Sequence, residues 1–139
     1  MNPVGRAITG VRIRHIATLT VCVIAAGLIC RLAPLGLSPW SRKWSGSVLW
    51  GALFWCLAAL VTRDDQRRTR LLLGALGTFG SEMLKLVHLA PLNALRKTGA
   101  GGFLLGSIFS WYDMVAYIAG LALMELTSIA VATRPRWRK

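Results

Sequence analysis

Five polar side chains recur on one face of the apolar segment between residues 71 and 91. At about 100° of rotation per helical residue they fall in a stripe about 120° wide, made of Thr78, Ser81, Glu82, Lys85 and His88. Glu82 and Lys85 are three residues apart, so their side chains can pair and each reduces the cost of burying the other. Two interpretations stay open. The stripe either only fixes helix packing, or lines an outward-facing polar pocket with Glu82 deepest and His88 near the rim.

Two further acids lie in the last apolar segment. Asp113 follows Ser110 by three residues, which is the spacing of a capping box, although that box prefers Glu or Gln. Alternatively, Asp113 pairs with Arg96 or Arg31. Glu125, further along the segment, can reach toward the arginines of residues 63–70.

Sequence motifs for catalysis and metal binding are absent from the chain. It contains no GxSxG, no HExxH, no phosphate-binding glycine loop and no metal-ligand spacing of Cys and His. His15 adjoins the basic N-terminus and His88 stands apart from it. We therefore expect no catalytic residue, metal or cofactor, although one His with nearby acids is a possible proton-transfer set.

Composition indicates a membrane protein. The chain has 139 residues, of which 55% are hydrophobic and 16% charged, against about 45–50% and about 25% in soluble domains. This apolar content excludes disorder. The net charge of +12 suits nucleic acid, but the basic residues form short clusters between apolar runs and make no stripe. The sequence predicts a single all-α membrane domain with no nucleic-acid partner.

Four segments are predicted to cross the bilayer as helices, at about residues 16–34, 47–62, 71–91 and 111–132. The first resembles a secretory signal, but Arg31 and Pro34 stand where small residues should form the cleavage site, so we expect it to be retained. The connection 92–110 is long and carries glycines. We expect it to be re-entrant or interfacial.

Small residues and cysteines carry packing information. Gly77 with Ser81, and Ala116 with Gly120, have the four-residue spacing that lets membrane helices approach closely, so we expect the third and fourth segments to pack together. Gly and Ala are also common in membrane helices for no such reason. All three cysteines are expected to be unpaired and buried as small hydrophobes: Cys22, Cys30 and Cys56.

Basic residues predict the topology. Eleven of them lie in the N-terminal tail, in the connection 63–70 and in the C-terminal tail, against five in the other two connections. By the positive-inside rule, both termini are cytoplasmic.

The stretch from Glu82 to Gly120 carries a family resemblance. It reads E-x-x-K-L-V-H-x-A-P-L-N-A-L-R-K-T-x-x-G-G-F-L-L-G-x-x-F-S-W-Y-D-M-V-A-Y-I-A-G, and it resembles the small bacterial inner-membrane proteins called domain of unknown function 2809. Their layout is similar to that of VanZ-like proteins, with an acid on one helix, an Arg in the connection and an Asp entering the next helix. The matching positions are Arg31, Trp50, Glu82, Pro91, Arg96, Thr98, Gly102, Trp111, Asp113, Tyr117 and Gly120.

Three positions depart from the family pattern. Lys85 stands where Gln is usual, and Ser47 and Asn93 stand where Asp is usual. These changes make the outer site more basic. The family has no agreed activity, so the resemblance implies a fold, a bacterial inner-membrane location and a set of residues.

Three functional hypotheses follow. The leading one is a site for an anionic lipid or lipid-linked headgroup, because Arg and Lys suit phosphate. The second is a small protein that translocates protons or solutes through Glu82. The third is a membrane enzyme that acts on a lipid precursor with His88 or Glu82 as base. Expected partners are membrane lipids and either a second copy or another membrane protein. The candidate ligand-binding residues are Arg31, Glu82, Lys85, His88, Arg96, Trp111, Asp113 and Tyr117.

Overall fold

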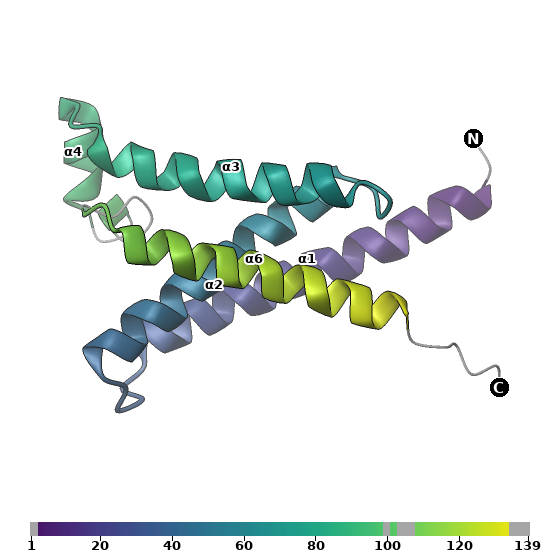
Figure 1. Cartoon of the computed structure of the whole chain (residues 1–139), viewed down its shortest axis with the longest axis horizontal. Helices are drawn as coiled ribbons and strands as arrows, with labels where there is room; N and C mark the ends of the chain where they lie inside the picture. Colours follow the sequence, from purple (N-terminus) through teal and green to yellow (C-terminus); the bar gives the residue numbers. More distant parts are fainter. Residues whose placement is uncertain (1–2, 99–100, 103–107, 134–139) are drawn as a thin grey trace.

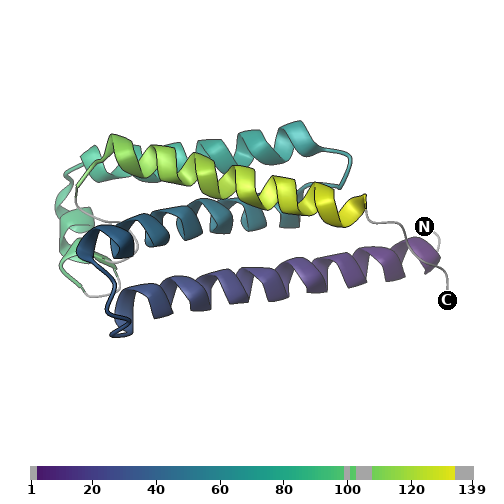
Figure 2. The ribbon, with the colours of Figure 1, turned by 60° about the horizontal axis from the view of Figure 1, so that its bottom comes forward.

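Helices make up the regular structure of residues 3–98, 101–102 and 108–133, which are the residues that the computed structural model describes. In chain order they are α1 (Pro3–Leu32), α2 (Pro39–Val61), α3 (Arg67–Leu86), α4 (Ala90–Arg96) and α6 (Trp111–Ala132). The predicted all-α class is confirmed. The long helices alternate in direction (Figure 1). As a result, the end of α1, the start of α2, the end of α3 and the start of α6 lie together beside α4 (Figure 2). We call this the α4 end of the bundle.

Helix boundaries depart from the prediction at several places. The last helix begins and ends where expected. The second helix starts early, because Ser38 caps it with a side chain that accepts the Ser41 amide at 3.1 Å, and Pro39 occupies its first turn. The third helix ends at Leu86 rather than 91, since Val87 is extended. Pro91 instead lies in the first turn of α4, where a missing N–H costs little.

Three helices are long and apolar enough to cross a membrane: Arg12–Leu32 within α1, all of α2 and all of α6. The third helix, α3, is not among them, so the predicted span at residues 71–91, and with it the count of four spans, is not confirmed. With 20 residues, α3 is about 30 Å long, which matches the thickness of a bilayer core. It is excluded by its charged residues: Arg67, Arg68, Arg70, Glu82 and Lys85.

The central helix of the bundle is α2, which packs against α1, α3 and α6. Its closest approach is to α6, because a Cβ at Gly120 would overlap the carbonyl oxygen of Val48, and one at Gly51 would overlap the backbone of Tyr117. The predicted packing of α3 on α6 is present. The small residues serve other contacts, however, since Gly120 faces α2 and Gly77 faces the Phe54 ring of α2.

The hydrophobic core surrounds Cys56, which is fully buried as expected. Cys22 is exposed and Cys30 half-buried, so the prediction of burial is wrong for these two. Both lie on α1, which packs against α2 and against no other helix in the described ranges. The other faces of α1 are therefore left uncovered. All three cysteines are free, as predicted.

Part of the connection 92–110 lies outside the described residues, at 99–100 and 103–107, so its re-entrant character is not tested. Its described start is the short helix α4, which lies across the end of α3 (Figure 1).

Candidate functional site

Glu82 is the deepest charged group at the α4 end, with none of its surface exposed. Its carboxylate accepts the Tyr117 hydroxyl at 2.5 Å, and it forms an ion pair with Lys85 one turn further along α3. The backbone amide of Ser110 lies 3.4 Å from its second oxygen. A buried carboxylate is tolerated when it is paired and hydrogen-bonded in this way.

The charge pattern continues from Glu82 across three helices. The Lys85 ammonium lies 3.8 Å from one Asp113 oxygen, and the Lys43 ammonium lies 3.6 Å from the other. The Ser47 hydroxyl donates to Asp113 at 3.2 Å. Acid and base alternate along this row, so its formal charges cancel. We call Glu82, Lys85, Asp113 and Lys43 the four-charge cluster.

Asp113 does not close a capping box. Ser110 is the N-cap of α6, but its side chain makes no capping hydrogen bond. Its hydroxyl lies 3.4 Å from the Lys43 ammonium, and its amide points to Glu82. Glu82 of the neighbouring helix thus takes the amide that a capping-box acid would accept. Asp113 remains in the first turn, where the helix dipole favours an acid.

Arg96 lies outside this cluster. Its guanidinium donates to the backbone carbonyls of Leu84 and Val87, the latter at 2.8 Å, and to the Asn93 side chain at 3.0 Å. The last carbonyls of a helix lack intrahelical partners, so this arginine stabilises the end of α3. The predicted pair of Arg96 with Asp113 is therefore not formed. The structure pairs Asp113 with the two lysines instead.

Two other candidate residues face outward at the α4 end. The His88 side chain is exposed, with Nδ1 2.9 Å from the Leu86 carbonyl oxygen. Trp111 is 71% exposed, and its ring meets Phe109 edge-on. Neither residue lines the cavity described next. An exposed Trp at a helix start is typical of a residue at a membrane interface.

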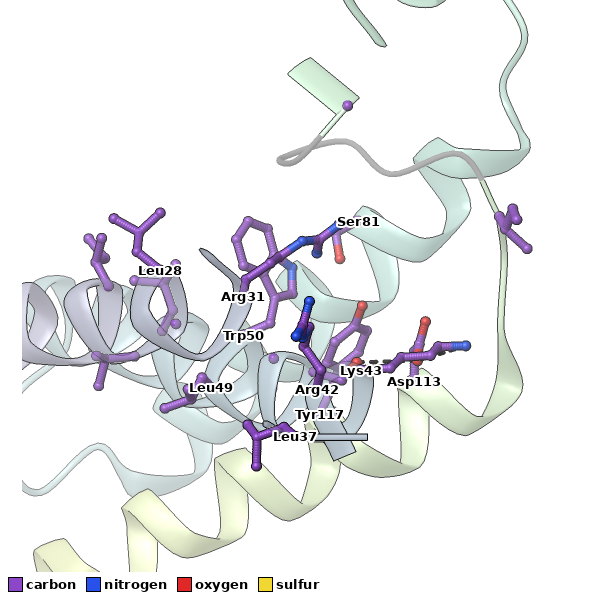
Figure 3. A pocket seen from close by; sticks show the side chains of 18 of the residues that line it. Leu28, Arg31, Leu37, Arg42, Lys43, Leu49, Trp50, Ser81, Asp113 and Tyr117 are labelled. Carbon is purple, nitrogen blue, oxygen red and sulfur yellow. Dashed lines mark hydrogen bonds and ion pairs between the residues drawn. The ribbon is translucent and has the colours of Figure 1, made fainter. Parts of the chain in front are cut away.

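A cavity of about 760 Å³ opens beside the four-charge cluster. Such volumes are typical of small-molecule sites. Its lining residues in the described part of the chain include four basic side chains and one acidic one: Arg31, Arg42, Lys43, Lys85 and Asp113. The Tyr117 side chain also contributes to the lining. The rest is largely apolar, with leucines from α1 and α2. Figure 3 shows Arg42, Lys43 and Asp113 toward one side of the cavity and Leu28 and Leu49 toward the other.

Comparison with known proteins supplies a family. A family model described as "Protein of unknown function (DUF2809)" matches residues 37–121, which is more than half of the chain. The chain belongs to the DUF2809 family. No solved structure matches it.

The DUF2809 match covers the whole four-charge cluster together with Tyr117. It starts after α1, so Arg31 and the α1 wall of the cavity lie outside the matched residues. The four-charge cluster thus lies within the residues that match the family model. The cavity also needs α1, which precedes the matched residues.

Sequence reasoning missed three polar side chains of the cavity of this DUF2809 protein, namely Arg42, Lys43 and Ser47, together with its apolar wall. Ser47 could have been found, because it is one of the three positions that depart from the family pattern. In the structure its hydroxyl donates to Asp113. Nothing in the local sequence ties Lys43 to an acid 70 residues later.

A second ion cluster lies at the opposite end of the bundle. Glu125 of α6 accepts hydrogen bonds from Arg70 at 2.9 and 3.1 Å, from Arg67 at 2.8 Å and from the Trp55 indole at 2.8 Å. Arg70 is only 3% exposed and lies over the Trp55 ring. We call these four residues the Glu125 cluster. It joins α2, α3 and α6, and it holds the start of α3 against the bundle.

Proposed function

We propose that this DUF2809 protein is a multi-pass membrane protein in which all four long helices span the bilayer, and that its cavity binds the headgroup of an anionic lipid or lipid-linked molecule. The resemblance stated above adds a bacterial inner membrane as the location. Membrane lipids are the partners that this function requires.

The inverted surface of α3 supports a fourth span. From Arg70 onward its charged residues turn inward, with the side chains of Arg70, Glu82 and Lys85 4%, 0% and 12% exposed. Only Arg67 and Arg68, in its first turn, are exposed. Its outward face consists of large apolar side chains: Leu72, Leu73, Leu76, Phe79, Leu84 and Leu86. A helix facing water would show the reverse arrangement. Composition counts Arg70, Glu82 and Lys85 against a membrane span, although these three side chains are paired inside the bundle.

The positions of the basic residues support the orientation. The start of α1, the connection between α2 and α3, and the end of α6 share one end of the bundle (Figure 2). These are the segments whose basic residues predict a cytoplasmic location. The α4 end, with the cavity and the four-charge cluster, then faces the outer leaflet.

The lining of the cavity carries the proposal of an anionic ligand. Four basic side chains and one acid meet at its polar side, and an apolar wall continues from them. Guanidinium and ammonium groups are the usual ligands of phosphate. Lys43 and Lys85 are already paired with Asp113. Arg31 and Arg42 are both exposed and line the same cavity, so they offer accessible donors to an incoming phosphate.

The test is retention of anionic lipid by the purified protein. The protein is exchanged into micelles containing phosphatidylglycerol and phosphatidylcholine, repurified, and its bound lipid is measured by mass spectrometry. We expect the double variant Arg31→Gln/Arg42→Gln to lose at least about tenfold of the bound phosphatidylglycerol, because a charge-assisted hydrogen bond contributes about 1.5–3 kcal/mol.

The matched control removes the same charge far from the cavity. Arg63→Gln/Arg68→Gln changes two exposed arginines near the α2–α3 connection, which line no part of the cavity, and should bind as the wild type does. Equal phosphatidylglycerol on all three proteins would refute the headgroup site. The mass of the particle in detergent also shows whether the protein is a homo-oligomer.

A proton carrier is the second candidate function. Glu82 is fully buried and is linked through Lys85 to Asp113, which lines the cavity. Such a chain of ionisable groups inside a membrane protein is typical of proton pathways. Liposomes containing the protein would then show a pH-driven proton flux that Glu82→Gln abolishes. A folded protein without flux would remove this candidate. His88, one of the two bases that the enzyme hypothesis names, lies outside the cavity.

A further inference from the structure

We propose that the apolar part of the cavity holds one hydrocarbon chain of the bound lipid, which enters sideways from the bilayer between α1 and α3. This inference rests on the proposed headgroup site, and it names the ligand as a membrane lipid with its chain still in place, rather than a soluble phosphate compound.

The apolar wall extends inward from the basic residues along α1. Val23, Ile24 and Leu28 line the cavity on this helix, opposite Leu49 and Leu53 of α2. From Arg31 to Val23 the wall runs eight residues, or about 12 Å along the helix axis. A headgroup phosphate needs no wall of this length, whereas a hydrocarbon chain does.

Gly27 leaves the cavity open at the middle of this wall. It lines the cavity, and a Cβ added there would meet no atom within 4 Å. Gly120 and Gly51, by contrast, lie against backbone on neighbouring helices. Gly27 thus faces open space in the cavity, which leaves room for an occupant beside α1.

The side entrance follows from how α1 is held. This helix packs against α2 and makes no helix contact with α3 or α6 in the described ranges, and Figure 2 shows it on the far side of α2 from both. Yet the cavity reaches from α1 to Ser81 and Lys85 on α3. Because no described helix contact joins α1 to α3 beside the cavity, we place the lipid entrance between these two helices.

The firm attachment of α1 is at the end away from the cavity. The Arg12 guanidinium donates to Asp64 at 2.6 Å and to the carbonyls of Ala59 and Thr62 at 2.9 and 2.7 Å, at the end of α2. A chain that enters beside Leu28 leaves these contacts intact. The basic side chains fit an anionic headgroup, and the apolar wall behind them fits a hydrocarbon chain. Together they favour an anionic lipid.

Photolabelling of the wild-type protein tests the position of the chain. The probe is phosphatidylglycerol with a photoactivatable diazirine on one acyl chain, in micelles of zwitterionic detergent. We expect labelled peptides to come from residues 23–28 and 49–53. Labelling confined to the outward faces of α3 and α6 would overturn the inference.

A steric plug provides the second test. Gly27→Trp fills the open space, and Gly80→Trp is the matched control, because Gly80 also meets nothing within 4 Å but lies exposed on α3, outside the cavity. We expect Gly27→Trp to retain at least about tenfold less dioleoyl phosphatidylglycerol than Gly80→Trp. Glycerol phosphate, which has the headgroup without a chain, should bind equally to both.

The outcomes separate the two proposals. If Arg31→Gln/Arg42→Gln loses the lipid while Gly27→Trp keeps it, the headgroup site stands and the chain groove is wrong. If Arg31→Gln/Arg42→Gln keeps the lipid, the proposed headgroup site is wrong, whatever the result with Gly27→Trp. If both variants lose it and the photolabel marks α1 and α2, both proposals are supported. Photolabelling of the unaltered protein decides the matter should Gly27→Trp fail to fold.

Discussion

The hydrogen bond between Tyr117 and Glu82 makes a quantitative prediction about stability. Three variants are needed: Glu82→Ala, Tyr117→Phe and the double variant. Glu82→Ala leaves the buried Tyr117 hydroxyl without its acceptor and leaves Lys85 with Asp113 at 3.8 Å. Tyr117→Phe removes one donor but keeps the ion pair between Glu82 and Lys85.

The expected magnitudes come from these contacts. Removing one partner of a buried ion pair costs about 3–5 kcal/mol, so Glu82→Ala should lie in that range. Tyr117→Phe should cost about 1.5–3 kcal/mol, as for other hydrogen bonds to a charged group. Hydrogen bonds between membrane helices show coupling energies that average about 0.6 kcal/mol and reach about 1.7 kcal/mol. The acceptor is a fully buried carboxylate, so we expect a coupling in the upper part of this range, about 1–1.7 kcal/mol.

The assay is reversible unfolding by titration with dodecyl sulfate in mixed micelles, followed by circular dichroism. Free energies of the wild type and the three variants give the coupling energy. Tyr112→Phe is the matched control, because Tyr112 lies on the same helix but is 73% exposed. It should change stability by no more than about 0.5 kcal/mol and add independently to Glu82→Ala. A coupling below about 0.3 kcal/mol for Tyr117 and Glu82 would refute the contact.

Two further predictions use the same unfolding assay. Gly120→Val should destabilise the protein by several kcal/mol, on the order of other overpacked cores, because its Cβ would overlap a carbonyl oxygen of α2. The Cβ of Gly80→Ala meets no atom, so this control should stabilise α3 by about 0.5–1 kcal/mol. Equal stability of these two variants would contradict the close contact of α2 and α6. Arg70→Ala should lower the free energy of unfolding by about 3–5 kcal/mol, because it removes a buried partner of Glu125. Arg68→Ala removes an exposed arginine two residues earlier and should lower it by no more than about 0.5 kcal/mol. Similar losses from both variants would show that burial of the Arg70–Glu125 pair contributes nothing.

Helical periodicity identified the inward face of α3. The stripe centred on Thr78, Glu82 and Lys85 is the face that the structure turns toward the bundle. Periodicity could do this because every ionised group in an apolar segment must find a partner or water. It says nothing about which helix supplies that partner. Lys43, 70 residues before Asp113 in the chain, therefore had no signal of its own.

The structure places His88 and Arg96 differently from the sequence prediction, for a separate reason in each case. His88 was placed on the stripe by extending the helical rotation beyond Leu86, where α3 ends and the backbone becomes extended. Its expected angle had no meaning there. Arg96 was matched to an acid because acids are visible in a sequence. Its actual partners are backbone carbonyls at the end of a helix, and every residue type carries one.

The two ion clusters explain how α3 combines a polar sequence with a place in the bundle. Arg70, in the Glu125 cluster, and Glu82, in the four-charge cluster, are twelve residues apart, or about 18 Å along the helix. No charged residue lies between them in the sequence. If α3 spans the bilayer as proposed, both clusters fall within the outer parts of a hydrocarbon core about 30 Å thick. Their charges are less costly there than at its centre, since water and headgroups are nearer. Because each cluster includes residues from α2 and α6, the same contacts that supply partners to Arg70 and Glu82 also fix the position of α3 beside the cavity.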